Sequence, residues 1–213
     1  MHLELTQILI CPHCGPPNGL IAFVDRMEER RIVEGRLDCP VCERRHAVRE
    51  GRVLLGDGAE DADGGAGGAD GGARGAGAAG DDPAATAAAL LGPHEGPEIL
   101  LLAGGAEPSA PAIADLRPEA AVLALGPGST ARHPRVYPVI PSHGGEHLPF
   151  RPGAFGGAVL TGGRSDLVAE VVPALAAGAR LVVLVPRGAR PDQAAPSLRE
   201  LASDARAWVG VRA

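Results

Sequence analysis

The chain has 213 residues, a net charge of −6 and no lysine, so all 20 of its basic residues are arginine. The absence of lysine excludes a phosphate-loop lysine and a Schiff-base lysine. The modest negative charge and an aromatic content of 2% disfavour a nucleic acid as a direct ligand. No apolar run approaches the roughly 20 residues that cross a bilayer, and the first residues lack the features of a signal peptide. We therefore expect no association with a membrane.

Two matching cysteine motifs follow a short helix predicted over residues 3–10. The motifs are Cys11-Pro12-His13-Cys14 and Cys39-Pro40-Val41-Cys42, with 24 residues between them. Each motif places two thiolates on one tight turn, and two such turns supply the four ligands of a tetrahedral zinc ion. A pair of disulfides and a redox-active motif are the alternatives. The repeated motif favours a structural zinc site with Cys11, Cys14, Cys39 and Cys42 as ligands, and its reduced thiolates indicate a cytoplasmic protein.

The rest of this first unit, residues 1–56, has the pattern of a small antiparallel sheet. Strands are predicted over residues 19–25, 31–37, 46–49 and 52–55, with a turn at Glu50-Gly51. A unit of this size has little core, so the metal is expected to contribute most of its folding free energy. His13 and His46 are interpreted as surface or packing residues, because four thiolates already complete the zinc shell.

Residues 5–14 and 37–55, which contain both cysteine motifs and the run Val48-Arg49-Glu50-Gly51, resemble a known family. It is the family of small zinc-ribbon proteins that bind and activate tRNA, ribosomal and release-factor methyltransferases. The chain departs from the family pattern at His46-Ala47 and at Arg52-Val53. The resemblance implies that the ribbon stabilises a methyltransferase partner, either in cis or in trans.

Residues 57–83 contain mainly Gly, Ala and Asp and no large aliphatic side chain. Such a segment cannot bury enough surface to offset its chain entropy, so we predict a flexible linker.

The third segment, residues 84–213, alternates short apolar runs with helical stretches. Strands are predicted over residues 98–102, 120–125, 136–140, 158–161 and 180–185, and helices over 84–91, 109–116, 166–177 and 194–204. This pattern predicts an α/β, Rossmann-like, mostly parallel sheet with helices on both faces, closed by an edge strand over 207–211.

Residues 147–160 and 171–183 resemble class I S-adenosylmethionine-dependent methyltransferases. In that family acidic residues hold the cofactor, and the aligned positions here carry Leu101, Gly144 and Gly156, while the second strand ends in Leu125-Gly126. Two lost hydrogen bonds to charged groups remove roughly 3–6 kcal/mol, or about 10² to 10⁴ in affinity. Gly104, Gly105 and Gly126 are interpreted as tight turns, and they are the residues that would line a cofactor site if one is present. Glu107 and Glu146 lie nearby but out of register.

These observations favour a zinc-binding, non-catalytic methyltransferase-like protein, a pseudoenzyme that acts as a binding or stabilising module. The alternative is an active S-adenosylmethionine-dependent methyltransferase, and a third hypothesis is a zinc-ribbon nucleic-acid binder. Ser142, His143 and His147 lie on the loop that would face a substrate, but no acid is placed by the sequence to orient either histidine. We therefore name no catalytic residue.

Overall fold

The computed structural model describes residues 1–55, 82–96, 98–126, 133–141, 147–162, 165–185 and 197–213. Residues 57–81 of the predicted linker lie outside the described residues. The amino-terminal unit (residues 1–55) consists of η1 (Leu3–Gln7), β1 (Ile21–Glu28), β2 (Arg31–Asp38), β3 (Arg45–Arg49) and β4 (Arg52–Leu55). The four predicted strands are confirmed, but the predicted helix is a single 3₁₀ segment. It ends at Gln7 because Leu9 and Ile10 pair with Phe150 and Gly19.

The second unit (residues 82–213) alternates strands and helices in its first half. Its elements are α1 (Pro83–Leu91), β5 (Ile99–Ala103), η2 (Glu107–Ser109), α2 (Ala110–Leu116), β6 (Ala121–Leu125), β7 (Val136–Pro141), β8 (Phe155–Thr161), α3 (Ser165–Val171), η3 (Val172–Ala174), β9 (Leu175–Leu184), β10 (Leu198–Ser203) and β11 (Ala207–Arg212). Helix α1 begins at Pro83, where the Asp82 carboxylate accepts from the Ala84 N–H.

Three predictions for the carboxyl-terminal third are wrong. The helix predicted over residues 194–204 is strand β10 within the described residues, because pairing with β11 overrides the helix propensity of Leu, Arg, Glu and Ala. The helix predicted to end at residue 177 gives way to β9 at Leu175, two residues after Pro173. Strand β11 is not at the edge, because it lies between β9 and β10.

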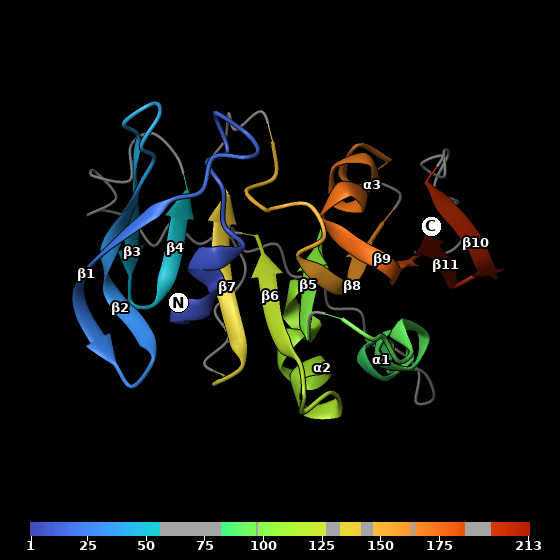
Figure 1. Ribbon diagram of the computed structural model, residues 1–213. Helices are drawn as coiled ribbons and strands as arrows, with labels where there is room; N and C mark the ends of the chain where they lie inside the picture. Colours follow the sequence, from blue (N-terminus) through green and yellow to red (C-terminus); the bar gives the residue numbers. More distant parts are fainter. Residues whose placement is uncertain (56–81, 97, 127–132, 142–146, 163–164, 186–196) are drawn as a thin grey trace.

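In the part of the chain that the structure describes, eleven strands form one continuous sheet (Figure 1). Their order is β1-β2-β3-β4-β7-β6-β5-β8-β9-β11-β10, and the central block from β4 to β9 is parallel. The strand order reverses between β5 and β8. This arrangement is a doubly wound sheet, in which ligands bind outside the carboxyl ends of the strands at the reversal point.

Alternate residues of the parallel strands pack into two separate cores. Leu100 and Leu102 of β5 face α1 and α2, whereas Leu101 and Ala103 face η1 and α3. Helices therefore cover both faces of the sheet, as predicted for this fold class. The core on the η1 side also contains Leu9, Leu37, Val48 and Val53, so the amino-terminal unit shares its core with the second unit.

The two units are joined by backbone pairing as well as by this core. Strand β4 pairs in parallel with β7, with Val53 opposite Val139. Below the first cysteine motif, the Ile10 N–H donates to the Pro149 carbonyl at 2.9 Å, and the Arg151 N–H donates to the Ile8 carbonyl at 2.8 Å. The loop that enters β8 is therefore held by the residues that precede Cys11.

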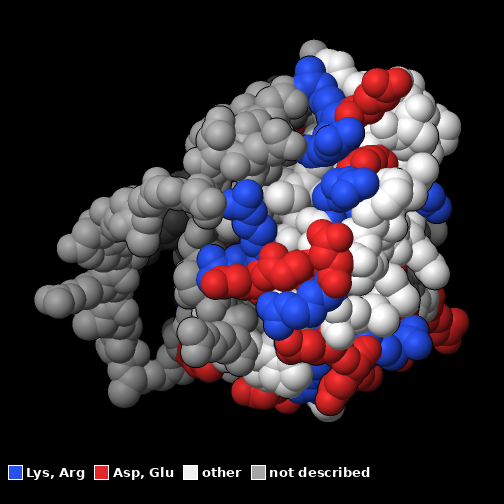
Figure 2. Space-filling view, turned by 90° about the vertical axis from the view of Figure 1, so that its left-hand side faces the viewer, with Lys and Arg blue, Asp and Glu red and all other residues white. Residues whose placement is uncertain are grey.

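The outer surface of the amino-terminal unit carries both signs of charge. Figure 2 views this side of the molecule and shows acidic and basic side chains interspersed, with no large field of one sign. Exposed ion pairs join Arg30 to Glu4, Arg26 to Glu28 and Glu34, and Arg52 to Glu50. Such pairs contribute little to stability, and the described residues of this face form no basic patch for nucleic acid. No helix in the described ranges has the length and apolar character needed to cross a membrane.

Candidate functional site

The four cysteines meet at the end of the amino-terminal unit that faces the carboxyl ends of the parallel strands. Their Sγ atoms all lie within 4.8 Å of one another, with 3.6 Å between Cys11 and Cys42 and 3.8 Å between Cys14 and Cys39. A tetrahedron with Zn–S bonds of about 2.3 Å has S···S edges of about 3.8 Å. A disulfide would bring two sulfurs to about 2.05 Å, and all four thiols are free. The geometry fits a metal and disfavours the disulfide alternative.

The two cysteine motifs adopt the same local turn. The Gly15 N–H donates to the Cys11 carbonyl at 2.9 Å, and the Glu43 N–H donates to the Cys39 carbonyl at 3.0 Å. Gly15 and Glu43, which follow the last cysteine of each motif, both have a positive φ of about 60°. Although burial opposes ionisation, backbone N–H groups of Cys42 and Val41 lower the pKa of Cys39 to about 7. The backbone of this turn thus favours the thiolate of Cys39. Burial raises the pKa of Cys11, and the neighbouring Cys42 thiol raises the pKa of Cys14 to about 12.

The neighbouring histidines are not part of this cluster. In the described ranges, the group of side chains close enough to share a metal consists of the four cysteines. His13 is exposed, and His46 is buried in β3, where burial lowers its pKa. The structure agrees with the interpretation of His46 as a packing residue, since a neutral imidazole is the form that burial favours.

The second candidate site is the region where β5 and β6 end. Gly104 and Gly105 follow β5 with φ values of 66° and 102°, which favour glycine, and Gly126 follows β6. The structure brings these glycines together around the side chain of Glu107. The Gly105 N–H donates to Glu107 Oε2 at 2.9 Å, and Glu107 Oε1 lies 2.6 Å from the place that a Cβ of Gly126 would occupy. In the alignment with the methyltransferase pattern, Glu107 is out of register with the cofactor-binding acids, so the sequence analysis did not include it in this site.

The Glu107 carboxylate is half-buried at the ends of the two strands. Burial raises the pKa of Glu107, against the opposing effect of the backbone N–H groups of Glu107, Gly105 and Gly104. The carboxylate therefore occupies the amide cradle of the glycine turn. The sequence does place Glu107 close to this turn, because it starts η2 two residues after Gly105. The orientation of that short helix, which the sequence does not specify, decides where the carboxylate lies.

A cavity of about 330 Å³ lies beside this turn, at the point where the strand order reverses. Gly105 and Thr161 line it from the ends of β5 and β8, Leu184 and Val185 from the end of β9, and Thr86 and Ser109 from the helices. Arg206 is the charged residue of the lining, and no carboxylate contributes to it within the described residues. The volume is within the range of small-ligand pockets.

The positions that would carry cofactor-binding acids hold apolar core residues. Leu101 is fully buried in β5, and Gly156 is buried in β8. Gly144, Glu146, Ser142 and His143 lie outside the described residues. His147 is exposed next to the first cysteine motif, with its Cδ2 atom 3.1 Å from the position of a Cβ on Gly15. His147 therefore lies beside the thiolate cluster, with no described acid to orient it.

The geometry around Glu107 can be tested by mutagenesis. We expect Gly126→Ala to destabilise the protein by about 1 kcal/mol, because the new methyl group displaces the carboxylate from the Gly105 N–H. Urea unfolding measures this free energy. In a Glu107→Ala background the same substitution should cost only a few tenths of a kcal/mol. An equal cost in both backgrounds would contradict the contact.

No protein-family model matches the sequence, and no curated protein matches it. Several solved methyltransferases resemble the structure at low identity. Geranyl diphosphate C-methyltransferase from Streptomyces coelicolor is 18% identical over 48% of this chain and 42% of its own, with a TM-score of 0.39. The antibiotic-resistance methyltransferase Kmr is 12% identical over 63% and 96%, with a TM-score of 0.44. A predicted O-methyltransferase from Agrobacterium tumefaciens is 15% identical over 61% and 80%, with a TM-score of 0.43.

The match thus spans less than half of the geranyl diphosphate methyltransferase chain. The fold class is defined by this chain's own strand order and two-sided packing. Counted from β5, its second unit has the order 3-2-1-4-5-7-6. This differs from the Rossmann order 3-2-1-4-5-6 by one antiparallel strand, β11, inserted between β9 and β10.

Proposed function

We propose that the protein is a zinc-binding, non-catalytic methyltransferase-like protein in which the amino-terminal zinc ribbon acts as a stabilising module for the sheet unit. The observation that carries this proposal is the four-sulfur cluster with tetrahedral spacing on a unit whose β4 extends the parallel sheet. Four protein ligands leave no open position for water or substrate, which is typical of structural zinc. Free thiolates also require a reducing compartment, so we place the protein in the cytoplasm.

The pairing of β4 with β7 favours a partner in cis. Residues Val53 and Leu55 of the amino-terminal unit occupy the edge of β7, with Val53 fully buried there. A ribbon from another chain would have to displace this strand before it could pair with β7. The stabilised domain is therefore the chain's own sheet unit, and a separate methyltransferase would have to bind a different surface.

Among the described residues no acid lines the pocket, and this supports a non-catalytic role. The nucleoside end of a cofactor needs charged acceptors, and Leu101 and Gly156 provide none. The Glu107 carboxylate, the one acid placed at the glycine turn in the described ranges, is held by the amide of Gly105. The carboxylate therefore occupies the backbone N–H group with which a ligand would form a hydrogen bond.

The same observation supports a second candidate, an active S-adenosylmethionine-dependent methyltransferase. A carboxylate at the ends of β5 and β6 can accept hydrogen bonds from a ribose, so Glu107 would replace one of the missing acids. This candidate requires the Glu107 carboxylate to accept hydrogen bonds from the ligand instead of from the Gly105 N–H. The two candidates therefore assign opposite roles to one residue.

Isothermal calorimetry with S-adenosylmethionine distinguishes them. For the metal-loaded protein we expect at most weak binding, with a dissociation constant of about 0.1 mM or higher, because losing two charged hydrogen bonds weakens a micromolar site by about 10² to 10⁴. Low-micromolar binding that Glu107→Gln weakens at least tenfold would overturn the non-catalytic proposal and establish the second candidate. Metal content is measured on the same sample, and about one zinc per chain is expected.

A further inference from the structure

The pocket of about 330 Å³ beside the glycine turn is built on a row of strand ends. Thr161 of β8 pairs with Leu184 of β9, and its Cβ lies 3.7 Å from the position of a Cβ on Gly105. The Val185 N–H donates to the Arg206 carbonyl at 2.8 Å, which continues the row to the start of β11. The helices α1 and η2 complete the lining with Pro83, Thr86 and Ser109.

Three hydroxyl groups of this lining are available to a ligand. They belong to Thr86, Ser109 and Thr161, and none forms a hydrogen bond with the part of the chain that the structure describes. Ser109 is the N-cap residue of α2, yet its side chain makes no capping bond. A hydroxyl both donates and accepts, so these groups suit a ligand head that also does both.

The described charged groups that flank the lining residues in the sequence already have partners. The carboxylates of Asp82, Glu107 and Asp204 each accept from backbone N–H groups close by in the chain. Arg206, the one charged residue of the described lining, is exposed and also interacts with another group. A charged ligand head would lose its hydration here without gaining a free counter-charge, which favours an uncharged head.

Apolar side chains form the remaining wall of the pocket. Leu184 packs against the core that α1 and α2 cover, and Pro83 and Val185 also line the pocket. No aromatic side chain contributes to the lining within the described ranges. The walls therefore suit an aliphatic body more than a stacked flat ring.

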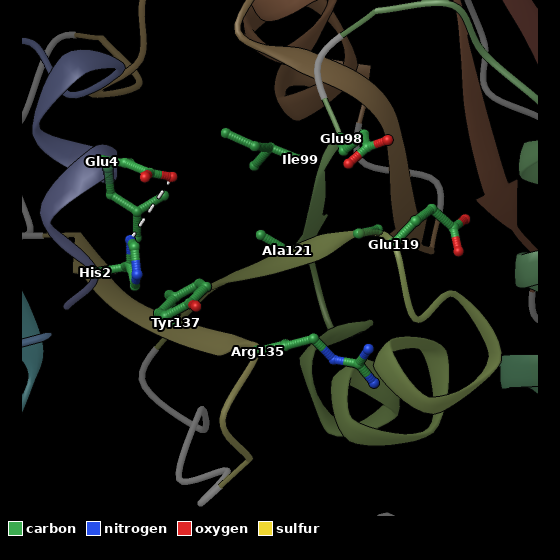
Figure 3. Close-up of a pocket in the computed structure, with 10 residues that line it drawn as sticks. His2, Glu4, Glu98, Ile99, Glu119, Ala121, Arg135 and Tyr137 are labelled. Atoms are coloured by element: carbon green, nitrogen blue, oxygen red, sulfur yellow. Dashed lines mark ion pairs between the residues drawn. The ribbon is translucent and has the colours of Figure 1, made fainter. Parts of the chain in front are cut away.

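A second cavity, of about 380 Å³, has no such convergence of polar groups. It opens between η1 and the amino ends of β5, β6 and β7, at the opposite end of the sheet (Figure 3). Figure 3 shows Glu4 and Glu98 on opposite sides of the hollow. Glu4 is bound to Arg30 at 2.8 Å, and Glu119 is bound to Arg117 at 2.6 Å. We assign no ligand to this cavity.

We propose that the pocket beside the glycine turn binds a small uncharged molecule with a short aliphatic body and a carboxamide head. The amide NH₂ donates and the amide carbonyl accepts, which matches the hydroxyls of Thr161 and Ser109, and the body packs against Leu184. A carboxylate only accepts and an ammonium only donates. The ligand goes beyond the proposed function and rests on it in one respect, because it requires that S-adenosylmethionine does not occupy this pocket.

Three probes of matched shape test the proposal. 4-Methylpentanamide is uncharged, whereas 4-methylpentanoate and 4-methylpentylammonium carry the same branched chain with opposite charges. NMR titration of the ¹⁵N-labelled, metal-loaded protein with the amide should give saturable shifts at Gly105, Thr161 and Leu184. A ligand of this size in a pocket open to solvent is expected to have a dissociation constant on the order of 1 mM. Each charged probe should bind at least about fivefold more weakly.

Matched variants test the assigned residues. Thr161→Val keeps the shape and strand propensity of the side chain but removes its hydroxyl, and it should weaken amide binding at least about threefold. Ser109→Ala should act in the same direction. Ser203→Ala, in β10 and outside the lining, is the control and should change binding less than about twofold, as should Arg206→Gln. Well-dispersed NMR spectra establish that each variant is folded.

The inference is overturned if the amide gives no saturable shift, if either charged probe binds as tightly, or if the shifts fall at Ile99, Ala121 and Tyr137 of the second cavity. Equal effects of Thr161→Val and Ser203→Ala would also overturn it. Calorimetry with S-adenosylmethionine separates this failure from that of the proposed function. Low-micromolar cofactor binding overturns both, whereas a failed amide titration without tight cofactor binding overturns this inference alone.

Discussion

Replacing Cys39 with serine will release the metal and unfold the amino-terminal unit, and it will lower the stability of the whole chain. Structural zinc contributes on the order of 10 kcal/mol to the folding of small units, and Cys39 supplies one of four sulfurs. The buried residues of the four-stranded unit belong to the cluster that it shares with the second unit, so loss of the metal disturbs both. Zinc analysis should fall from about one metal per chain to near zero, and far-UV circular dichroism should show a loss of strand signal.

The loss should extend into the second unit, because the two share a core and a strand pairing. Val53 and Leu37 belong to the same buried cluster as Leu123 and Val139, and unfolding of β4 exposes the edge of β7. Amide exchange at Val139 should therefore accelerate in the variant. The matched control is Val41→Ser in the same cysteine motif, because Val41 is 62% exposed and provides no ligand. If Cys39→Ser keeps its metal and its melting temperature, the metal assignment is wrong.

The sequence predicted the clustering of the four cysteines well because the signal is local. Each cysteine motif fixes two ligands on one turn, and the spacing of the motifs leaves little choice of partner. The buried strands β5, β6 and β7 were also predictable, since strands covered on both faces are continuous apolar runs. The pattern fails at β10, where Leu198–Ser203 has residues that suit a helix, and only the pairing with β11 makes it a strand.

Other features depend on contacts between segments that are distant in the sequence. Apolar runs do not specify their neighbours, so the parallel pairing of β4 with β7 was not predictable from either strand. The same is true of the cavity near Tyr137, which is assembled from η1 and the starts of three strands. Glu107 shows a further limit of prediction from sequence motifs. Its carboxylate reaches Gly126 from a short helix after β5. Motif alignment compares positions along the chain and does not detect a side chain that reaches a site from a neighbouring turn.

Phe155→Ala will destabilise the protein by about 3–5 kcal/mol, because it removes the largest fully buried side chain at the junction of the two units. The Phe155 ring meets the Phe150 ring edge-on, with 4.9 Å between centroids. Phe150 in turn pairs with Leu9, two residues before the first thiolate. The aromatic pair therefore connects β8, at the strand-order reversal, to the segment that enters the metal cluster. Urea unfolding followed by circular dichroism measures the loss.

A double-mutant cycle separates the aromatic contact from simple cavity formation. Edge-to-face pairs contribute about 0.5–1.5 kcal/mol beyond burial, so the losses of Phe150→Ala and Phe155→Ala should be non-additive by about that amount. Leu116→Ala, at a half-exposed position of α2, is the control and should cost less than about 0.5 kcal/mol. If Phe155→Ala lowers stability no more than Leu116→Ala, the two units are not held by this contact. If the loss is large and metal affinity also falls, the junction transmits strain from the sheet to the thiolate cluster through Leu9.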